Sequence, residues 1–228
     1  MAWKTAVLIY GSAFLCTTLQ AASFSFTLGS PTPSFADGQV PIGTATYNMA
    51  VAGNAAPFNG FIGSDVFGPD FSASWAYSYS PISGSIASAT LTLGLYDVDS
   101  AAPGNQVASF TLSGTDLTAS LNASLESLHG GAGSANAEYD IISLTLPAST
   151  FTALAGGSPA LNLLLQGPGL GVLGTTPFNG AGLDFSTLTI TTQAAPVPEP
   201  AAYALAALGI AAIGYVRLRC HRLRCHRL

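Results

Sequence analysis

Apolar and polar residues alternate along much of the middle of the chain, which is the pattern of half-buried β-strands. In residues 71–80 the aromatic and small apolar residues share one face and serine fills most of the other. Leucine and isoleucine alternate in the same way within 89–96, 139–146 and 161–165. Further strand candidates are 24–28, 45–51, 107–112 and 185–190, the last with a bulge after Phe185. Clusters of Gly, Pro, Asn and Asp separate these runs, so we predict about eight strands in a mainly β fold, a β-sandwich or jelly roll.

One stretch has helical spacing instead. Its leucines recur every three or four residues: Leu117, Leu121, Leu125 and Leu128. Thr115 is a candidate N-cap and Gly130 a candidate stop, so the sequence predicts a single amphipathic helix near 116–128. Residues 147–155 are a candidate for one further short helical turn. Pro-Phe-Asn-Gly occurs at 57–60 and again at 177–180, which predicts two similar turns.

The N-terminus has the order of a secretory signal peptide. Lys4 precedes an apolar run over 5–16, and small residues follow at Ala21, Ala22 and Ser23. The apolar run is too short to span a bilayer stably, and the small residues suit a cleavage site. We predict a signal peptide over 1–22 and a β domain over 23–195.

The C-terminal segment, 196–228, combines three features. Val197-Pro198-Glu199-Pro200 is followed by an uncharged apolar run over 201–216 and then by arginines. At about 1.5 Å rise per residue a helix over 201–216 is about 24 Å long, short for a hydrocarbon core of about 30 Å. The basic tail, 217–228, predicts that this end stays cytoplasmic while the domain faces the other side. The arginines are Arg217, Arg219, Arg222, Arg224 and Arg227.

This order of features resembles the PEP-CTERM sorting signal of Gram-negative bacteria. The resemblance rests on Val197, Pro198, Glu199 and Pro200, the apolar run, and the basic cluster that begins with Arg217, Arg219 and Arg222. It implies recognition by an exosortase, a membrane-embedded cysteine transpeptidase, near the Pro-Glu-Pro, and a link to exopolysaccharide. The duplicated Arg-Cys-His-Arg-Leu at 219–228 departs from the usual short tail.

Basic residues are missing from the middle of the chain. All six Lys and Arg residues lie at Lys4 or from Arg217 onward, whereas all eleven Asp and Glu residues except Glu199 lie between 23 and 195. Nothing in the domain can neutralise phosphates, so nucleic acid is a poor partner. The cysteines, Cys16, Cys220 and Cys225, lie outside the domain, which therefore has no disulfide.

Few residues of the predicted domain are candidates for catalysis. The domain holds one histidine, His129, whose position at a predicted helix end favours a capping role over that of a base. There is no cysteine or lysine nucleophile, no phosphate-binding loop and no zinc ligand set. The pairs Asp97/Asp99 and Asp65/Asp70 keep a glycoside hydrolase open as an alternative. We expect no enzymatic activity.

Two sets of residues are candidates for ligand binding. Asp97 and Asp99 follow a predicted strand at positions i and i+2, which lets both carboxylates meet one calcium ion; the alternative is a solvated turn. Trp75, Tyr77 and Tyr79 lie on alternate strand positions, where they form either a sugar-stacking platform or part of the core. A buried stripe favours the core, and an exposed one favours a carbohydrate-binding module.

Together these features predict an exported surface or matrix protein with a structural or adhesive role in exopolysaccharide or biofilm. The expected partners are an exosortase, matrix components, and the membrane through the C-terminal helix before processing. The expected path crosses the inner membrane, passes through a transient anchored state and ends at the cell surface or in the extracellular matrix. A non-catalytic carbohydrate-binding module is the alternative function, and no cofactor other than calcium is expected.

Overall fold

The computed structural model describes residues 21–102, 104–128, 137–171, 173–194 and 209. Within them, Ala22–Gln193 form one compact unit. Its strands are β1 (Ser23–Gly29), β2 (Phe61–Ile62), β3 (Ser72–Ala76), β4 (Ile86–Tyr96), β5 (Val107–Leu112), β6 (Thr115–Asp116), β7 (Tyr139–Thr145), β8 (Ala160–Leu165), β9 (Leu170–Gly171), β10 (Gly174–Thr175) and β11 (Ala181–Thr192). Its helices are α1 (Gly43–Val51), α2 (Thr118–Glu126) and α3 (Phe151–Ala155), the last preceded by a 3₁₀ turn over Ala148–Thr150.

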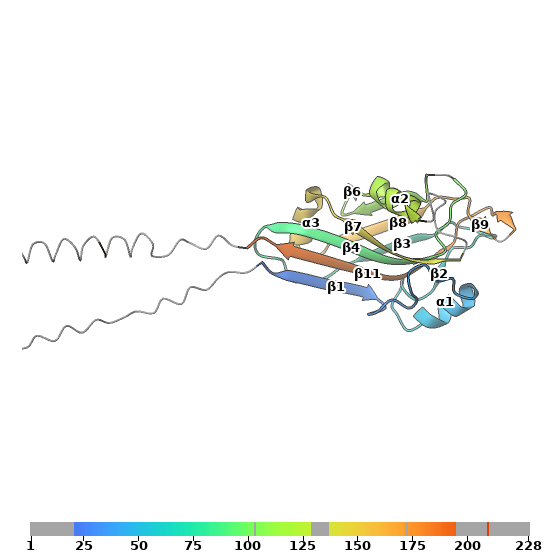
Figure 1. Cartoon of the computed structure of the whole chain (residues 1–228), viewed down its shortest axis with the longest axis horizontal. Coiled ribbons are helices and arrows are strands. Elements are labelled where there is room, and N and C mark those ends of the chain that lie inside the picture. The colour runs from blue at the N-terminus through green and yellow to red at the C-terminus, as the bar shows by residue number, and fades with distance from the viewer. Residues whose placement is uncertain (1–20, 103, 129–136, 172, 195–208, 210–228) are drawn as a thin grey trace, which may run out of the picture. The chain divides into compact units, whose positions relative to one another are not determined.

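The strands form two larger antiparallel sheets. One has the order β1-β11-β4-β7, with β2 also paired to β11, and the other has the order β3-β8-β5-β6. Strands β9 and β10 form a separate two-stranded hairpin. The long central strands β4 and β11 lie side by side in Figure 1 and pair along almost their whole lengths. Neither larger sheet closes on itself, so the fold is mainly β with open sheets, as the alternation predicts.

The main core lies between these two sheets. Alternate residues of β3, β5 and β8 meet alternate residues of β4, β7 and β11 in one apolar cluster. The indole of Trp75 on β3 and the hydroxyl of Tyr77, which follows β3, hydrogen-bond the hydroxyl of Ser186 on β11 at 3.1 and 2.6 Å. These contacts join the two sheets directly.

A second apolar cluster covers the outer face of β4 and β11, and helix α1 builds it. The prediction of a strand over 45–51 is wrong, because Tyr47 and Val51 lie one helical turn apart on α1 and are fully buried. The Tyr47 ring stacks on Tyr96 of β4 at 4.7 Å between centroids. Gly182 of β11 makes room for it, since a Cβ there would lie 2.3 Å from Tyr47 Cζ.

Strand β11 is buried on both faces, which explains its mixed pattern. The predicted bulge after Phe185 lies instead just before it, where the register to β4 shifts between Leu183 and Phe185. Phe185 packs in the outer cluster with Tyr47, whereas Leu188 and Ile190 face the inner core. Phe185 lies an odd number of residues from Leu188 and Ile190, so ordinary strand alternation places it on the opposite face.

The predicted helix at 116–128 is present as α2, with Leu121 and Leu125 fully buried. It begins later than expected, because Thr115 and Asp116 form β6 on the edge of β5. The Asp116 carboxylate accepts from the backbone N–H of Thr118 at 2.9 Å and so stabilises the helix start. The candidate turn at 147–155 is also helical, so the prediction of a single helix in the domain is wrong: the described residues between Ala22 and Gln193 contain three α-helices.

The two ends of the sandwich differ. Ala22 and Thr192 are hydrogen-bonded side by side, so the chain enters and leaves the domain at one end, hereafter the terminal end. At the other end of β11, Gly182 pairs with Tyr96, and α1 and the β9–β10 hairpin lie there (Figure 1). About 3.3 Å per residue along the twelve residues of β11 separates the two ends by roughly 35 Å.

Several predicted segments lie outside the described residues. They are most of the signal peptide (1–22), His129, the sorting motif Val197–Pro200, the basic tail with Arg217, Arg219 and Arg222, and the apolar helix 201–216 apart from Gly209. In the part of the chain that is described, no helix is both long and apolar enough to cross a membrane.

Candidate functional site

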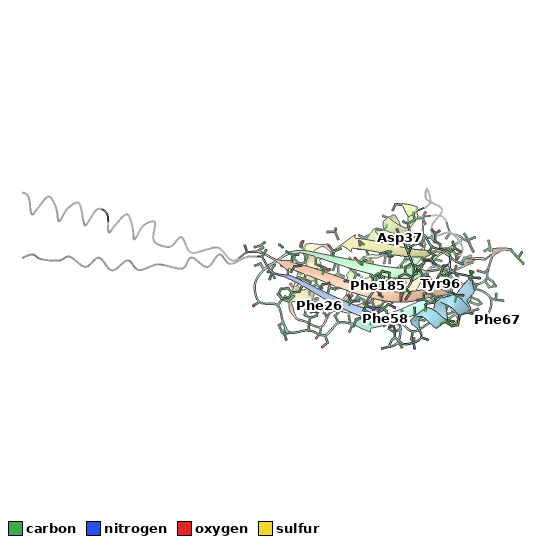
Figure 2. All side chains as sticks on the ribbon, turned by 60° about the horizontal axis from the view of Figure 1, so that its bottom comes forward. Phe26, Asp37, Phe58, Phe67, Tyr96 and Phe185 are labelled. Carbon is green, nitrogen blue, oxygen red and sulfur yellow. The ribbon has the colours of Figure 1, made fainter. Side chains whose placement is uncertain are left out.

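Acidic side chains gather at the end of the domain opposite its chain termini, hereafter the acidic end. Strands β4 and β7 reach this end at Tyr96 and Tyr139, which pair with each other, and β11 begins there. Figure 2 shows Tyr96, Asp37 and Phe67 toward this end and Phe26 toward the other. The carboxylates on the strands and loops at or near this end are Asp37, Asp65, Asp70, Asp97, Asp99, Glu138, Asp140 and Asp184. With no Lys or Arg between residues 5 and 216, no such cation within the domain balances them.

Three of these carboxylates are fixed in the same way by three different loops. The Oδ1 atom of Asp65 accepts from Gly180 N at 2.9 Å, that of Asp97 from Ala137 N at 2.6 Å, and that of Asp99 from Leu170 N at 3.2 Å. The backbone of Asp97 has φ +62°, a left-handed conformation that ends β4 and turns the side chain into the loops. Each carboxylate is thus held by a backbone N–H through its Oδ1 atom.

Burial dominates the electrostatics of Asp97 and Asp99. Their side chains are 6% and 1% exposed, and desolvation raises the pKa of Asp97 to about 6 and that of Asp99 to about 8. The neighbouring charge of Asp97 adds to the rise for Asp99, and that of Asp65 adds a smaller part for both. The pKa of the Tyr96 hydroxyl is also raised, first by burial and then by the charges of these same carboxylates. The sequence prediction that Asp97 and Asp99 lie together is consistent with this geometry.

Several buried side-chain oxygens at this end have no hydrogen-bond partner among the described residues. They include Oδ2 of Asp99, Oδ1 of Asn179 and the hydroxyl of Tyr47 on α1, and both Asn179 and Tyr47 are fully buried. Asn179 is the residue before Gly180, and its own N–H donates to Asp70 Oδ1 at 2.9 Å. Unpaired buried oxygens are costly and call for a donor or a cation. Within the described residues, however, no three carboxylate, histidine or cysteine side chains are arranged to hold one metal ion.

Asp184 is the centre of a separate buried network, which the sequence pattern does not reveal. It is fully buried on β11, and its carboxylate accepts from Ser34 N and Ser34 Oγ, both at 2.8 Å. It also accepts from the Tyr139 hydroxyl at 2.7 Å and from the hydroxyl of Ser30. The network joins the segment after β1 to β7 and β11. Its hydrogen bonds therefore stabilise the fold.

The aromatic stripe lies mainly in the core. Trp75 and Tyr77 are 6% and 2% exposed and hydrogen-bond Ser186 across the sandwich. Tyr79 is half-buried, stacks on Phe26 with centroids 4.1 Å apart, and donates to Leu154 O at 2.7 Å. The interpretation of Trp75 and Tyr77 as a sugar-stacking platform is therefore wrong, because both are buried in the core; Tyr79 is half-buried and stacks on Phe26.

A surface hollow lies beside α2. Its lining residues are Gly104, Asp116, Thr118, Ala119, Asn122, Ala123 and Glu126. The pKa of Asp116 is lowered by hydrogen bonds from the Thr118 side chain and backbone, so it stays ionised. Glu126 Oε1 accepts from Gln106 Nε2 at 2.6 Å. Glycoside hydrolysis requires one carboxylic acid held protonated near neutral pH, and Asp116 is unsuited to that role.

Comparison with known proteins gives one match. Residues 196–222 match the PEP-CTERM protein-sorting motif, which confirms the resemblance carried by Val197–Pro200 and the basic cluster. The motif marks the chain as an exported protein directed to an exosortase. No curated protein and no solved structure matches the chain. The β domain must therefore be understood from its own geometry.

Proposed function

We propose that this protein is a component of the cell surface or extracellular matrix, with a structural or adhesive role associated with exopolysaccharide in a biofilm. The sorting motif at 196–222 is the observation that carries the proposal, because it marks the chain as an exported protein directed to an exosortase. The apolar run 201–216 then serves as a transient membrane anchor until cleavage near Pro198–Pro200 releases the domain or transfers it to its final attachment.

The architecture of the domain supports a display role. The chain leads into the C-terminal segment at the terminal end, through the last residues of β11. The loops at the acidic end carry exposed apolar side chains, among them Ile42, Phe67 and Leu173, which are 91%, 87% and 102% exposed. Exposed apolar side chains concentrated on one part of a soluble domain are typical of surfaces that contact other molecules.

The same features support a role without catalysis. The buried carboxylates of the acidic end are fixed by backbone N–H groups, and Asp184 is enclosed by hydroxyl and amide donors. These side chains stabilise loops and are not displayed toward a substrate cleft. We therefore propose that the domain acts as a structural or adhesive component that binds other molecules and catalyses no reaction.

Carbohydrate binding is the second candidate, and the hollow beside α2 favours it over the aromatic stripe. Asn122, Thr118 and Glu126 line it with amide, hydroxyl and carboxylate groups, which are the groups that bind sugar hydroxyls. The Asn122 side chain is bonded to the backbone N–H and carbonyl of Val107, so the test fills the hollow from the exposed Ala123 instead. Loss of polysaccharide binding in Ala123→Gln, with an unchanged melting temperature, distinguishes this candidate from a purely structural role.

Deletion of the gene in the native host tests the proposed function. We expect altered biofilm mass, aggregation or colony texture, with unchanged growth in defined medium. Reintroduction of the full chain should restore the phenotype, whereas a chain ending at residue 195 should not, because it lacks the sorting motif. An unaltered biofilm would contradict the proposal, as would a purified chain that cleaves polysaccharide or ester at about 1 s⁻¹ or faster.

A further inference from the structure

Strand β1 is an open edge of the β1-β11-β4-β7 sheet: among the described residues it pairs with β11 alone (Figure 1). Its backbone groups point to alternate sides of the strand. The bond from Thr192 N to Ala22 O, at 2.9 Å, shows that the even-numbered residues bond to β11. The odd-numbered residues Ser23, Ser25 and Thr27 therefore direct their N–H and C=O groups outward, where no described residue bonds to them.

Natural sheets protect such an edge with a charged side chain, a proline, a bulge or a covering segment. The sequence of β1, Ser-Phe-Ser-Phe-Thr-Leu-Gly, has no charge and no proline, and its pairing with β11 runs without a shift of register. The opposite edge of the same sheet, β7, is covered. There Asp37 Oδ1 accepts from Ile141 N at 2.7 Å. Gln39 also forms an antiparallel bridge with Tyr139, so β1 is the edge of this sheet that is left free.

The side chains of β1 are complementary to a second copy of the same strand. Phe26 and Leu28 pack against the main core, and Phe24 lies on the same face but is 37% exposed. In an antiparallel pair the outward-directed residues of the two strands lie opposite each other, so odd-numbered residues meet odd-numbered ones. Serine and threonine then face serine and threonine, while phenylalanine and leucine face each other and cover the exposed Phe24 ring.

The distribution of charge favours the antiparallel orientation of two copies. Most carboxylates of the domain lie at or near the acidic end, whereas β1 begins at the terminal end and carries no charge. An antiparallel pair places the acidic end of each domain beside the terminal end of the other. A parallel pair would bring two acidic ends together with no Lys or Arg from either domain between them.

We propose that β1 is a self-association site, through which two copies of this chain pair edge to edge in antiparallel orientation and join their sheets into one. Two-fold symmetry uses both β1 edges, so the assembly closes as a dimer. Its contacts are mainly backbone hydrogen bonds along one short strand, so the interface is small and the association weak and reversible.

The pairing has a consequence for the position of the chain termini. Because the strands run antiparallel, the terminal ends of the two domains point in opposite directions. Such a dimer suits copies that are attached to facing surfaces or released into the matrix. This consequence rests on the proposed function, whereas the pairing itself rests only on the geometry and sequence of β1.

Analytical ultracentrifugation of the full-length chain in mild detergent, at increasing protein concentration, tests the pairing. We expect a monomer–dimer equilibrium. Hydrogen exchange read by mass spectrometry locates the contact in the wild-type chain. Protection of the amides in 23–29 should rise with protein concentration, because the N–H groups of Ser25 and Thr27 gain partners, while protection of β3 should stay constant.

Proline at position 25 removes the outward N–H and leaves the bonds to β11 in place, which edge strands tolerate. Ser25→Pro should weaken dimerisation at least about tenfold, because symmetry removes a hydrogen bond from each copy. Ser74→Pro is the matched control. Ser74 is an exposed serine on β3, an edge of the other sheet, and its N–H also points outward because Phe71 O bonds to Leu165 N of β8. This variant should keep the wild-type dimer.

Two results would overturn the proposal. One is a wild-type chain that stays monomeric, or whose exchange in 23–29 does not depend on concentration. The other is a dimer that Ser25→Pro retains in full, which would place the contact on β3 or in the C-terminal segment. The exchange of the wild-type chain decides the question even if a variant fails to fold. Either failure leaves the export role untouched, because that role rests on the C-terminal motif.

Discussion

Replacement of Asp184 by alanine is expected to lower the free energy of unfolding by several kcal/mol, about 3–5 kcal/mol by comparison with other broken buried polar networks. The carboxylate is fully buried and accepts hydrogen bonds from Ser30, Ser34 and Tyr139. Alanine supplies no acceptor, so the Tyr139 hydroxyl and the Ser34 N–H lose their partner inside the protein. It also leaves a cavity between β7, β11 and the segment after β1.

Chemical denaturation of the full-length chain measures this effect, with Asp116→Ala as the matched control. Asp116 is also an aspartate that accepts from a backbone N–H, but it is exposed at the start of α2. Its loss should cost about 1 kcal/mol, as for other helix caps. Equal losses for the two variants would contradict the account of Asp184 as the centre of a buried network.

The second large effect is a dependence of stability on pH in the presence of a chelator. The pKa of Asp97 is raised to about 6 and that of Asp99 to about 8, chiefly by burial, against about 3.9 in the unfolded chain. Between pH 4 and pH 8 the folded state therefore binds more protons than the unfolded state, and stability falls as pH rises. At about 1.4 kcal/mol per pKa unit, the loss between pH 5 and pH 8 should be on the order of 5 kcal/mol, most of it from Asp99.

Urea denaturation in EDTA at a series of pH values measures this dependence. The wild-type chain should be most stable near pH 4–5, and Asp99→Asn should flatten most of the profile because it removes the group with the higher pKa. A wild-type stability in EDTA that rises steadily from pH 5 to pH 8 has the opposite sign and would contradict the burial of these carboxylates in the absence of a cation.

The strands that border the inner core were the most predictable part of the fold. Residues 107–112 form β5 with those bounds, and 139–146 form β7 with one residue less. In both strands alternate apolar residues face the inner core, Phe110 and Leu112 from β5 and Ile142 and Leu144 from β7. Where both faces of a strand are buried, apolar and polar residues no longer alternate, and the sequence does not show which residues face the inner core. Strand β11 carries Phe185 on one face and Leu188 on the other, so its bulge could not be placed from spacing.

Helix α1 shows the limit of local propensity. Its sequence, with threonine, tyrosine and valine, favours a strand, and tertiary packing overrides that preference. What decides the outcome is a space above Gly182 that only a side chain from outside the sheet can fill, and Tyr47 fills it. The position of that space depends on the pairing of β4 with β11, which no local pattern specifies.

Only part of the candidate site could be predicted from the sequence. The spacing of Asp97 and Asp99 points to a shared location, but nothing near them in sequence identifies Asp65 or Asn179, which long loops bring in. The repeated Pro-Phe-Asn-Gly predicts two similar turns, but the two copies bury different residues. In the first copy Phe58 is buried and Asn59 exposed, whereas in the second Asn179 is buried and Phe178 is half-buried.

Intact mass spectrometry of the mature protein from the native host tests the central claim, that the chain is exported and processed at its sorting motif. In cells with the exosortase, we expect a chain without residues 1–22 and without the arginine tail, cut near Pro198–Pro200. In cells that lack the exosortase, the tail should remain. A mature chain that still carries Arg217–Leu228 in exosortase-positive cells would contradict the account.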